Sequence, residues 1–168
     1  GISYDEMVTQ LTDYYDGYHF CEKSEDIFNP FSLILAMANH KLSNYWFGSG
    51  TPSYIINVMK KFQTNIKDIE KKDVGITDFD VSPEQMTTPL PLLYQSGYLT
   101  IKRYDPLFSI YTLDYPNKEV RLGMLNSLAP NYLSPTASDN NSFLIEFLKD
   151  MRRHDINAAF ERLRAYLA

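Results

Sequence analysis

Apolar residues recur at helical spacing through the first sixty positions, and each apolar run begins with a helix-start pattern. The first run follows Ser3-x-x-Glu6, a capping box in which each side chain satisfies the other residue's backbone amide. Gly17 can end this helix in the left-handed conformation. Asn29-Pro30 and Thr51-Pro52 each place a capping residue before a proline suited to the first helical turn. We therefore predict three helices before residue 63.

The middle of the chain changes from helical spacing to alternation. Residues 73–85 contain glycine, aspartate and proline and are typical of a loop or a short strand. A short apolar helix, capped by Thr87 or Thr88, is predicted to follow and to end at Gly97. Period-two alternation then predicts two strands, at 98–104 and 108–113, joined by a tight turn at 105–106.

The last third of the chain returns to helical spacing. Pro116-Asn117 begins a helix that reaches Pro130. Residues 134–142 are rich in Ser, Pro, Asn and Asp and are the best linker candidate. Two further helices are predicted at 143–151 and 155–167, and their short connection indicates an antiparallel pair.

These elements predict a mainly α fold with a small β-hairpin. We divide it into a helical segment at 1–50, a winged-helix-like unit at 51–133, and a linker with a helical hairpin at 134–168. The order helix, helix, short apolar helix, hairpin, helix is that of a winged-helix-like unit. An isolated hairpin is marginal in water, so this one must pack against the helices.

Composition narrows the class of protein. The 168 residues are 44% hydrophobic and carry a net charge of −5, which is atypical of a nucleic-acid-binding domain. One cysteine, Cys21, excludes an internal disulfide and favours a reducing, cytoplasmic location. No segment approaches the ~20 apolar residues of a membrane span, so we expect no membrane partner. Gly1 directly before a helix start is typical of a cut point in a longer protein.

The sequence contains no constellation that indicates catalysis, and we predict no catalytic residue. It has neither a P-loop nor a G-x-G-x-x-G element, and its three histidines are scattered. His19 and Cys21 lie two residues apart, a spacing that suits a Cys–His couple but that also arises commonly by chance. Asp16 beside Gly17 is compatible with nucleotide or partner binding, or with an ordinary helix end.

Two acidic groupings invite comparison with metal sites. Asp78 and Asp80 form a spaced pair, but carboxylates in a polar loop are usually solvated. Asp68, Glu70 and Lys72 have the residue types of a D…E-x-K nuclease core, which requires a buried strand that this lysine-rich segment does not predict. We predict no metal site and no cofactor on this chain.

Basic residues offer an alternative function as a DNA-binding winged helix. The candidate recognition helix at 89–96 contains no basic residue, and residues 1–28 have a net charge of −6. This charge distribution favours docking against neighbouring domains over insertion into a DNA groove. The candidate nucleic-acid contacts are Lys60, Lys61, Lys67, Lys71, Lys72, Lys102 and Arg103.

Several motifs, spaced along the chain, resemble those of one protein family. They are Tyr15-Asp16-Gly17-Tyr18, Phe28-Asn29-Pro30-x-Ser32, Tyr45-Trp46, Gly50-Thr51-Pro52 and Leu92-x-x-x-x-Gly97-Tyr98-Leu99. Residues 4–133 resemble the middle region of bacterial AAA-ATPase-like proteins that carry a C-terminal PD-(D/E)xK nuclease-like domain. The helix pair at 142–167 is similar to the connector before that nuclease-like domain.

The resemblance implies a non-catalytic coupling and interaction module. ATP and Mg²⁺ are then expected only in an upstream nucleotide-binding domain, and the partners are the flanking domains. Nucleic acid remains an alternative partner. Under this interpretation the contacts toward the ATPase are Tyr15, Asp16, Tyr18 and Trp46. The helix pair faces the nuclease-like effector.

Overall fold

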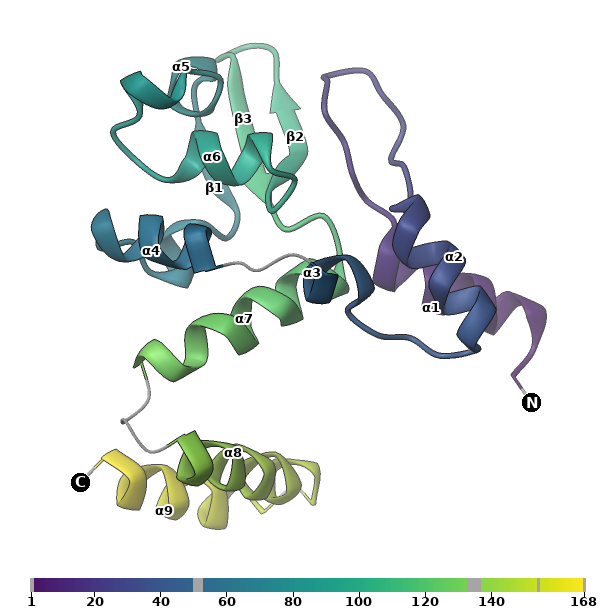
Figure 1. The fold of residues 1–168 in the computed structure, drawn as a ribbon, viewed down its shortest axis with the longest axis vertical. Coiled ribbons are helices and arrows are strands. Elements are labelled where there is room, and N and C mark those ends of the chain that lie inside the picture. The colour runs from purple at the N-terminus through teal and green to yellow at the C-terminus, as the bar shows by residue number, and fades with distance from the viewer. Residues whose placement is uncertain (1, 50–52, 133–136, 154, 168) are drawn as a thin grey trace. The chain divides into compact units, whose positions relative to one another are not determined.

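The computed structural model describes residues 2–49, 53–132, 137–153 and 155–167. The chain divides into two compact units, residues 1–127 and 128–168. The helical segment at 1–50 and most of the predicted winged-helix-like segment therefore belong to one unit. The described part of the chain is mostly helical and contains a small antiparallel sheet (Figure 1).

The first unit begins with three helices. The first two have the predicted caps, whereas the third, with five residues, was not predicted. Ser3 Oγ accepts from the Glu6 amide at 3.2 Å, and Glu6 Oε2 accepts from the Ser3 amide at 2.8 Å. Asn29 Oδ1 accepts from the Ser32 amide at 3.2 Å. These contacts confirm the first two predicted helix starts, whereas Thr51-Pro52 lies outside the described residues. The helices are α1 (Tyr4–Tyr15), α2 (Pro30–Asn39) and α3 (Tyr45–Ser49).

Short elements then lead to the sheet. They are α4 (Ser53–Lys61), the 3₁₀ turn η1 (Ile66–Asp68), β1 (Lys72–Val74), α5 (Ile76–Phe79), a second 3₁₀ turn η2 (Pro83–Gln85) and α6 (Leu90–Gln95). Gly97 has φ +76° and ends α6 as expected. The segment at 73–85, predicted as loop or short strand, supplies the end of β1 and a helical turn.

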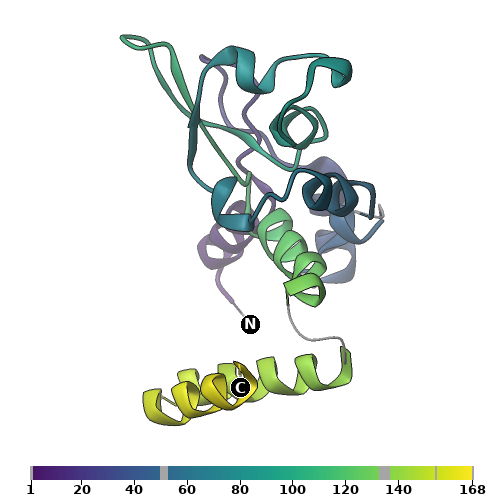
Figure 2. The ribbon, with the colours of Figure 1, turned by 90° about the vertical axis from the view of Figure 1, so that its left-hand side faces the viewer.

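The sheet has three strands where the alternation predicted only a hairpin. β2 (Thr100–Asp105) and β3 (Ile110–Asp114) form the predicted hairpin, and β1 pairs antiparallel with β3, giving the order β1-β3-β2. Because β1 has three residues, period-two alternation could not identify it. The tip of the hairpin projects beyond the helices of this unit (Figure 2).

A β-bulge in β2 positions a lysine. Ile101 pairs with Leu113 and Arg103 with Thr112, so Lys102 is the extra residue between two consecutive pairs. Bulges commonly redirect a side chain. Lys102 Nζ donates to the backbone carbonyls of Gly17 at 3.0 Å and Pro116 at 2.8 Å. The bulge therefore fastens the loop between α1 and α2 to the segment that follows β3.

The core of the first unit lies between the sheet, α4, α6 and α7 (Lys118–Tyr132). Its fully buried side chains include Met59, Ile69, Phe79, Leu93, Leu99, Leu113, Val120 and Met124. The apolar stripes predicted for α4, β2 and α7 supply several of these residues. None of the helices within the four described ranges combines the length and apolar character that a bilayer crossing requires.

The second unit contains the two C-terminal helices, α8 (Ala137–Arg152) and α9 (Ile156–Leu167). They pack side by side, as predicted (Figure 1). Arg162 Nε donates to Asp150 Oδ2 at 2.9 Å across the pair. α8 begins at Ala137, earlier than the polar composition of residues 134–142 suggested, because Ser, Asp and Asn are also favourable in a first helical turn.

Candidate functional site

Two of the motif segments, those of Ser32 and Trp46, meet at the carboxylate of Glu119 in the first turn of α7. Glu119 is completely buried. Its Oε1 accepts from the Trp46 amide at 2.7 Å and from Ser32 Oγ at 3.0 Å. Ser32 Oγ also accepts from the Trp46 amide at 3.1 Å. One carboxylate oxygen thus joins the starts of α2, α3 and α7.

This carboxylate has an unusual electrostatic environment. Burial raises the pKa of Glu119, and the hydrogen bonds from Ser32 and from the amides of Trp46 and Phe47 act in the opposite direction. Its second oxygen, Oε2, is buried and has no hydrogen-bond partner among the described residues. An ionised carboxylate in such a place is costly unless it is fully hydrogen-bonded. Glu119 is therefore a buried titratable group in which only one of the two carboxylate oxygens accepts hydrogen bonds from described residues.

Tyr15 fastens the end of α1 to the segment before α3. Its hydroxyl donates to the Ser43 carbonyl and accepts from the Ser43 amide, both at 2.9 Å. Next to it, the Tyr14 hydroxyl donates to Asn44 Oδ1 at 3.1 Å. The ring of Tyr15 is fully buried. Tyr15 therefore acts inside this unit as a packing and hydrogen-bonding residue.

Gly17 is required by the close approach of two backbones. It has φ +95°, and a Cβ at this position would lie 2.2 Å from the carbonyl oxygen of Pro116. The loop that follows runs beside β2, where the Ile101 amide donates to the His19 carbonyl at 3.1 Å (Figure 1). The His19 amide donates to Thr100 Oγ1 at 2.7 Å. Asp16 and Gly17 thus form a helix end followed by a docked loop.

Tyr18 and Trp46 form an aromatic group beside the Glu119 cluster. The Trp46 ring lies 5.3 Å from the Tyr98 ring and 6.4 Å from the Tyr18 ring. Burial raises the pKa of Tyr18 to about 12, although the nearby side chains of Asn29 and Asn117 lower it. Neither of these side chains has the geometry of a hydrogen bond to the Tyr18 hydroxyl. The hydroxyl is thus buried near polar groups without an aligned partner.

The four predicted inter-domain residues differ in accessibility. Tyr15 and Tyr18 are buried, whereas Asp16 and Trp46 are half-buried. Of the four, only Asp16 and Trp46 therefore keep exposed surface with which another domain could make contact. Whether these residues face another domain stays a prediction.

Sequence reasoning missed Glu119, which joins these motifs. A signal was present: Glu119 and Gly123 are four residues apart in a predicted helix and share one face. A glycine on a helix face permits close approach of a neighbouring element. A Cβ on Gly123 would lie 2.3 Å from the Phe47 ring, so α3 packs directly on this face. That approach brings the first amides of α3 to the glutamate.

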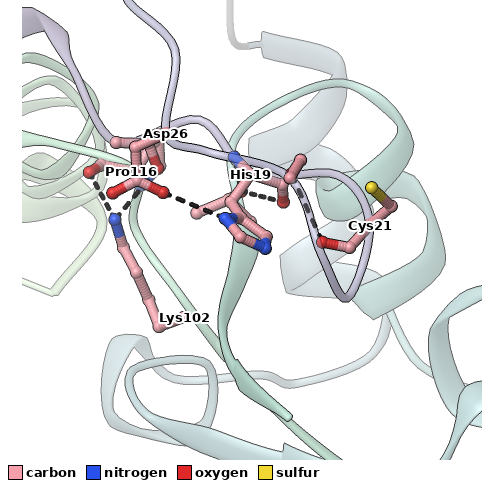
Figure 3. Close-up of polar contacts among 8 residues, drawn as sticks. His19, Cys21, Asp26, Lys102 and Pro116 are labelled. Atoms are coloured by element: carbon pink, nitrogen blue, oxygen red, sulfur yellow. Dashed lines mark hydrogen bonds and ion pairs between the residues drawn. The ribbon is translucent and has the colours of Figure 1, made fainter.

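The residues weighed as a Cys–His couple or as a metal pair have local structural partners. The His19 ring points toward the Asp26 carboxylate, and Cys21 lies in the neighbouring turn (Figure 3). His19 Nδ1 lies 3.1 Å from Asp26 Oδ1, and the Cys21 carbonyl accepts from Ser24 Oγ. Asp78 Oδ2 accepts from the Gly75 amide at 2.8 Å. Among the described residues, no three His, Cys, Asp or Glu side chains gather as a metal site would require.

The residues of the nuclease-like spacing each have a separate structural role. Asp68 Oδ2 accepts from the Asn65 amide at 2.8 Å, which closes a turn. Glu70 Oε1 accepts from Arg121 Nε at 3.2 Å. Lys72 begins β1 and pairs with Leu113. Their contacts are those of a turn, an ion pair and a sheet edge.

The seven basic candidates do not form one continuous group around a single pocket. Lys67 and Lys71 line one pocket, and Lys102 and Arg103 line another. Arg103 lies 3.9 Å from Asp73, and the ammonium of Lys102 is held by two carbonyls (Figure 3). The other three basic candidates are exposed and line neither pocket: Lys60, Lys61 and Lys72.

Comparison with known proteins adds one relative. The chain is 29% identical over 143 residues to the uncharacterized protein in the vnfD 5′ region of Azotobacter chroococcum mcd 1. The match covers 82% of this chain but 26% of that protein, so the chain spans about a quarter of the relative's length. No family model matches the sequence. No solved structure matches the fold.

Proposed function

We propose that this chain is a non-catalytic coupling and interaction module within a longer protein. The resemblance of its motifs assigns the flanking parts as an upstream nucleotide-binding domain, which would hold ATP and Mg²⁺, and a downstream nuclease-like domain. The module receives a displacement from one flanking domain and transmits it through its own packing to the other.

An apolar surface on α1 and α2 is the observation that carries this proposal. Between the two helices lies a groove of about 430 Å³, lined by residues that include Met7, Leu11 and Met37. Ile34 is 64% exposed and Met37 57% exposed on α2. Large apolar side chains grouped on a surface favour a protein interface.

The occupant of this groove is inferred to be a flanking part of the same polypeptide. The relative is about four times as long as the matched region, so most of that protein lies outside the part that this chain matches. Ile2, next to the first helix, is itself part of the groove wall. The residues that line the groove are mainly apolar, so the complementary surface is mainly apolar as well.

Glu119 connects this surface to the rest of the unit, so that a displacement of α2 can reach α3 and α7. Ser32, in the first turn of α2, donates to Glu119, which also accepts from the first turn of α3. A movement of α2 away from α7 breaks a buried hydrogen bond, which costs on the order of 1–3 kcal/mol. The hydrogen bonds of Glu119 therefore hold α2 in place during small displacements and break in large ones. Such a contact separates two discrete positions of α2, as a switching element requires.

The test compares the longer protein with this isolated region. The double variant Ile34→Asp, Met37→Asp should change the free energy of unfolding of the isolated 168 residues by less than about 0.5 kcal/mol, because both side chains are exposed. Thermal unfolding of the variant and the wild type measures this difference. In the full-length protein it should increase amide hydrogen exchange across α1 and α2, because the flanking domain no longer covers them.

Leu107→Asp is the matched control, since Leu107 is 79% exposed at the hairpin tip, away from α1 and α2. Equal exchange in the wild-type and Ile34→Asp, Met37→Asp full-length proteins would contradict the proposal. So would an increase that Leu107→Asp reproduces.

A second candidate function is DNA binding by a winged helix. The observation in its favour is topological: the order α4-β1-α5-α6-β2-β3, with strand order β1-β3-β2, is compatible with a winged-helix unit whose third helix is α6. The charge distribution opposes it, because α6 carries no basic residue. We place this function second for that reason.

A further inference from the structure

A charged pocket opens at the beginning of α7 and shares no lining residue with the groove on α1 and α2. Its volume is about 480 Å³, within the range of small-ligand sites. Four of its residues are cationic and three are anionic. In the sequence analysis Lys67 and Lys71 are two of seven candidate nucleic-acid contacts, whereas the structure places them in a pocket with the start of α7. The lining is Asp13, Lys67, Glu70, Lys71, Asp114, Tyr115, Asn117, Lys118 and Arg121.

Two ion pairs among these charges leave two lysines and one carboxylate of the pocket without an ion pair in the described part of the chain. Lys118 Nζ lies 2.7 Å from Asp13 Oδ2, and Arg121 Nε lies 3.2 Å from Glu70 Oε1. The third anion, Asp114, accepts from the Tyr115 amide at 2.8 Å. Within the described ranges, Lys67 and Lys71 have neither a hydrogen bond nor an ion pair through their ammonium groups.

Uncharged donors at the pocket also favour an anion. The pocket includes Asn117, whose Oδ1 accepts from the Val120 amide at 3.1 Å and whose Nδ2 is buried with no hydrogen-bond partner among the described residues. The N-terminus of α7, a 15-residue helix, carries the positive end of its dipole. Tyr115 is 5% exposed, and its hydroxyl has no hydrogen-bond partner in the described structure.

The two existing ion pairs do not block such a ligand. The side chains of Lys118 and Arg121 are each 58% exposed, and exposed ion pairs contribute little stability. An incoming dianion can recruit either cation at small cost, in addition to Lys67 and Lys71. Charge-assisted hydrogen bonds to an anion are stronger than those between neutral groups.

We propose that this pocket binds a phosphate group, with Lys67 and Lys71 as its principal ligands and the start of α7 as its floor. The phosphate is either inorganic or part of a nucleotide, because both present the same dianionic oxygens. This site is independent of the docking surface on α1 and α2. Either proposal can therefore fail without the other.

The experiment is a two-dimensional NMR titration of the 168-residue chain, with affinities measured by isothermal titration calorimetry. The ligands are inorganic phosphate, ADP and adenosine, each at constant ionic strength maintained with sodium chloride. Phosphate and ADP should shift the amides of residues 67–71 and 117–121, and adenosine should not. Tighter binding of ADP than of phosphate would identify a nucleotide as the source.

Two double variants complete the test. Lys67→Gln, Lys71→Gln should weaken phosphate binding by about tenfold or more, because two charged ligands are lost. Lys60→Gln, Lys61→Gln removes the same charge from neighbouring positions outside the pocket and should leave the affinity within about twofold. Absence of shifts at millimolar phosphate, or equal losses in both double variants, would overturn the proposal.

Discussion

At the scale of single residues, Glu119 is the most consequential side chain of the first unit. It is a carboxylate with no cation among the groups that hold it, and its hydrogen bonds come from a hydroxyl and from backbone amides. Such a group is stable only while every bonded oxygen keeps its donors. Because it ties the starts of three helices, its protonation state affects the packing of all three.

The stability of the protein should depend on pH through Glu119. Burial raises its pKa above the ordinary value of 4.5, so the folded state binds the proton more tightly than the unfolded state. Stability then falls as the pH rises from about 4.5 through the raised pKa. Urea unfolding between pH 4 and pH 8 should show this fall in wild type and a smaller one in Glu119→Gln.

Glu6→Gln is a control of opposite sign. The amide and hydroxyl of Ser3 lower the pKa of Glu6, so its stabilising effect is present above about pH 4.5 and is lost as the pH falls. In this variant the free energy of unfolding should therefore decrease less than in wild type as the pH falls below about 4.5. A Glu119→Gln protein with the same pH profile as wild type would show that burial does not raise the pKa of Glu119.

At the scale of secondary-structure elements, the contact between α3 and α7 decides how the motifs meet. α3 has only five residues and is not stable alone. Its Phe47 ring packs against the position where Gly123 lacks a side chain. Tyr98 lies on another side of this ring, with centroids 5.7 Å apart. The short helix is thus held by its packing and by Glu119.

Gly123→Ala tests this contact. Alanine favours a helix over glycine by about 1 kcal/mol, but here its methyl group would overlap the Phe47 ring. We expect a net loss of about 1–3 kcal/mol in the free energy of unfolding, because overpacking outweighs propensity. Urea denaturation followed by circular dichroism measures it.

Gly48→Ala is the matched control for this substitution. Gly48 lies in α3, and a Cβ there would meet no atom within 4 Å. The variant should be neutral or more stable by up to about 1 kcal/mol. A Gly123→Ala protein as stable as Gly48→Ala would mean that Phe47 does not pack directly against the Gly123 position.

At the scale of the whole molecule, charge is distributed unevenly. The net charge is −5, and the acidic residues concentrate before position 29. The basic candidates separate into the pocket of Lys67 and Lys71, the hairpin, the end of α4 and the start of β1. DNA binding requires several cations along one path of phosphates. This distribution instead favours contact with a protein surface.

We therefore expect weak binding to duplex DNA. Fluorescence-anisotropy titration at physiological salt should give a dissociation constant weaker than about 10 μM, in the range of non-specific contacts. Replacing Arg103 by Gln should change it by less than about twofold, because its guanidinium already lies near Asp73. Micromolar or tighter binding that weakens steeply with salt and with lysine replacement would instead promote the winged-helix candidate.

The sequence by itself determined most of the local structure. Ser3-x-x-Glu6 and Asn29-Pro30 predicted the starts of α1 and α2, because caps act within one helical turn. Alternation predicted the β2–β3 hairpin, since neighbouring strands and their turn are local. The C-terminal helix pair followed from a short connection between two apolar stripes.

Only the tertiary structure decided which residues meet. β1 is too short to show a pattern, and its strand state comes from pairing with β3, nearly forty residues later. Glu119 looked like an ordinary residue of a first helical turn. It became the centre of the motif cluster because Gly123 lets α3 approach α7. Lys67 and Lys71 line one pocket with the start of α7 because long-range packing places them together. Local spacing in the sequence does not encode that packing.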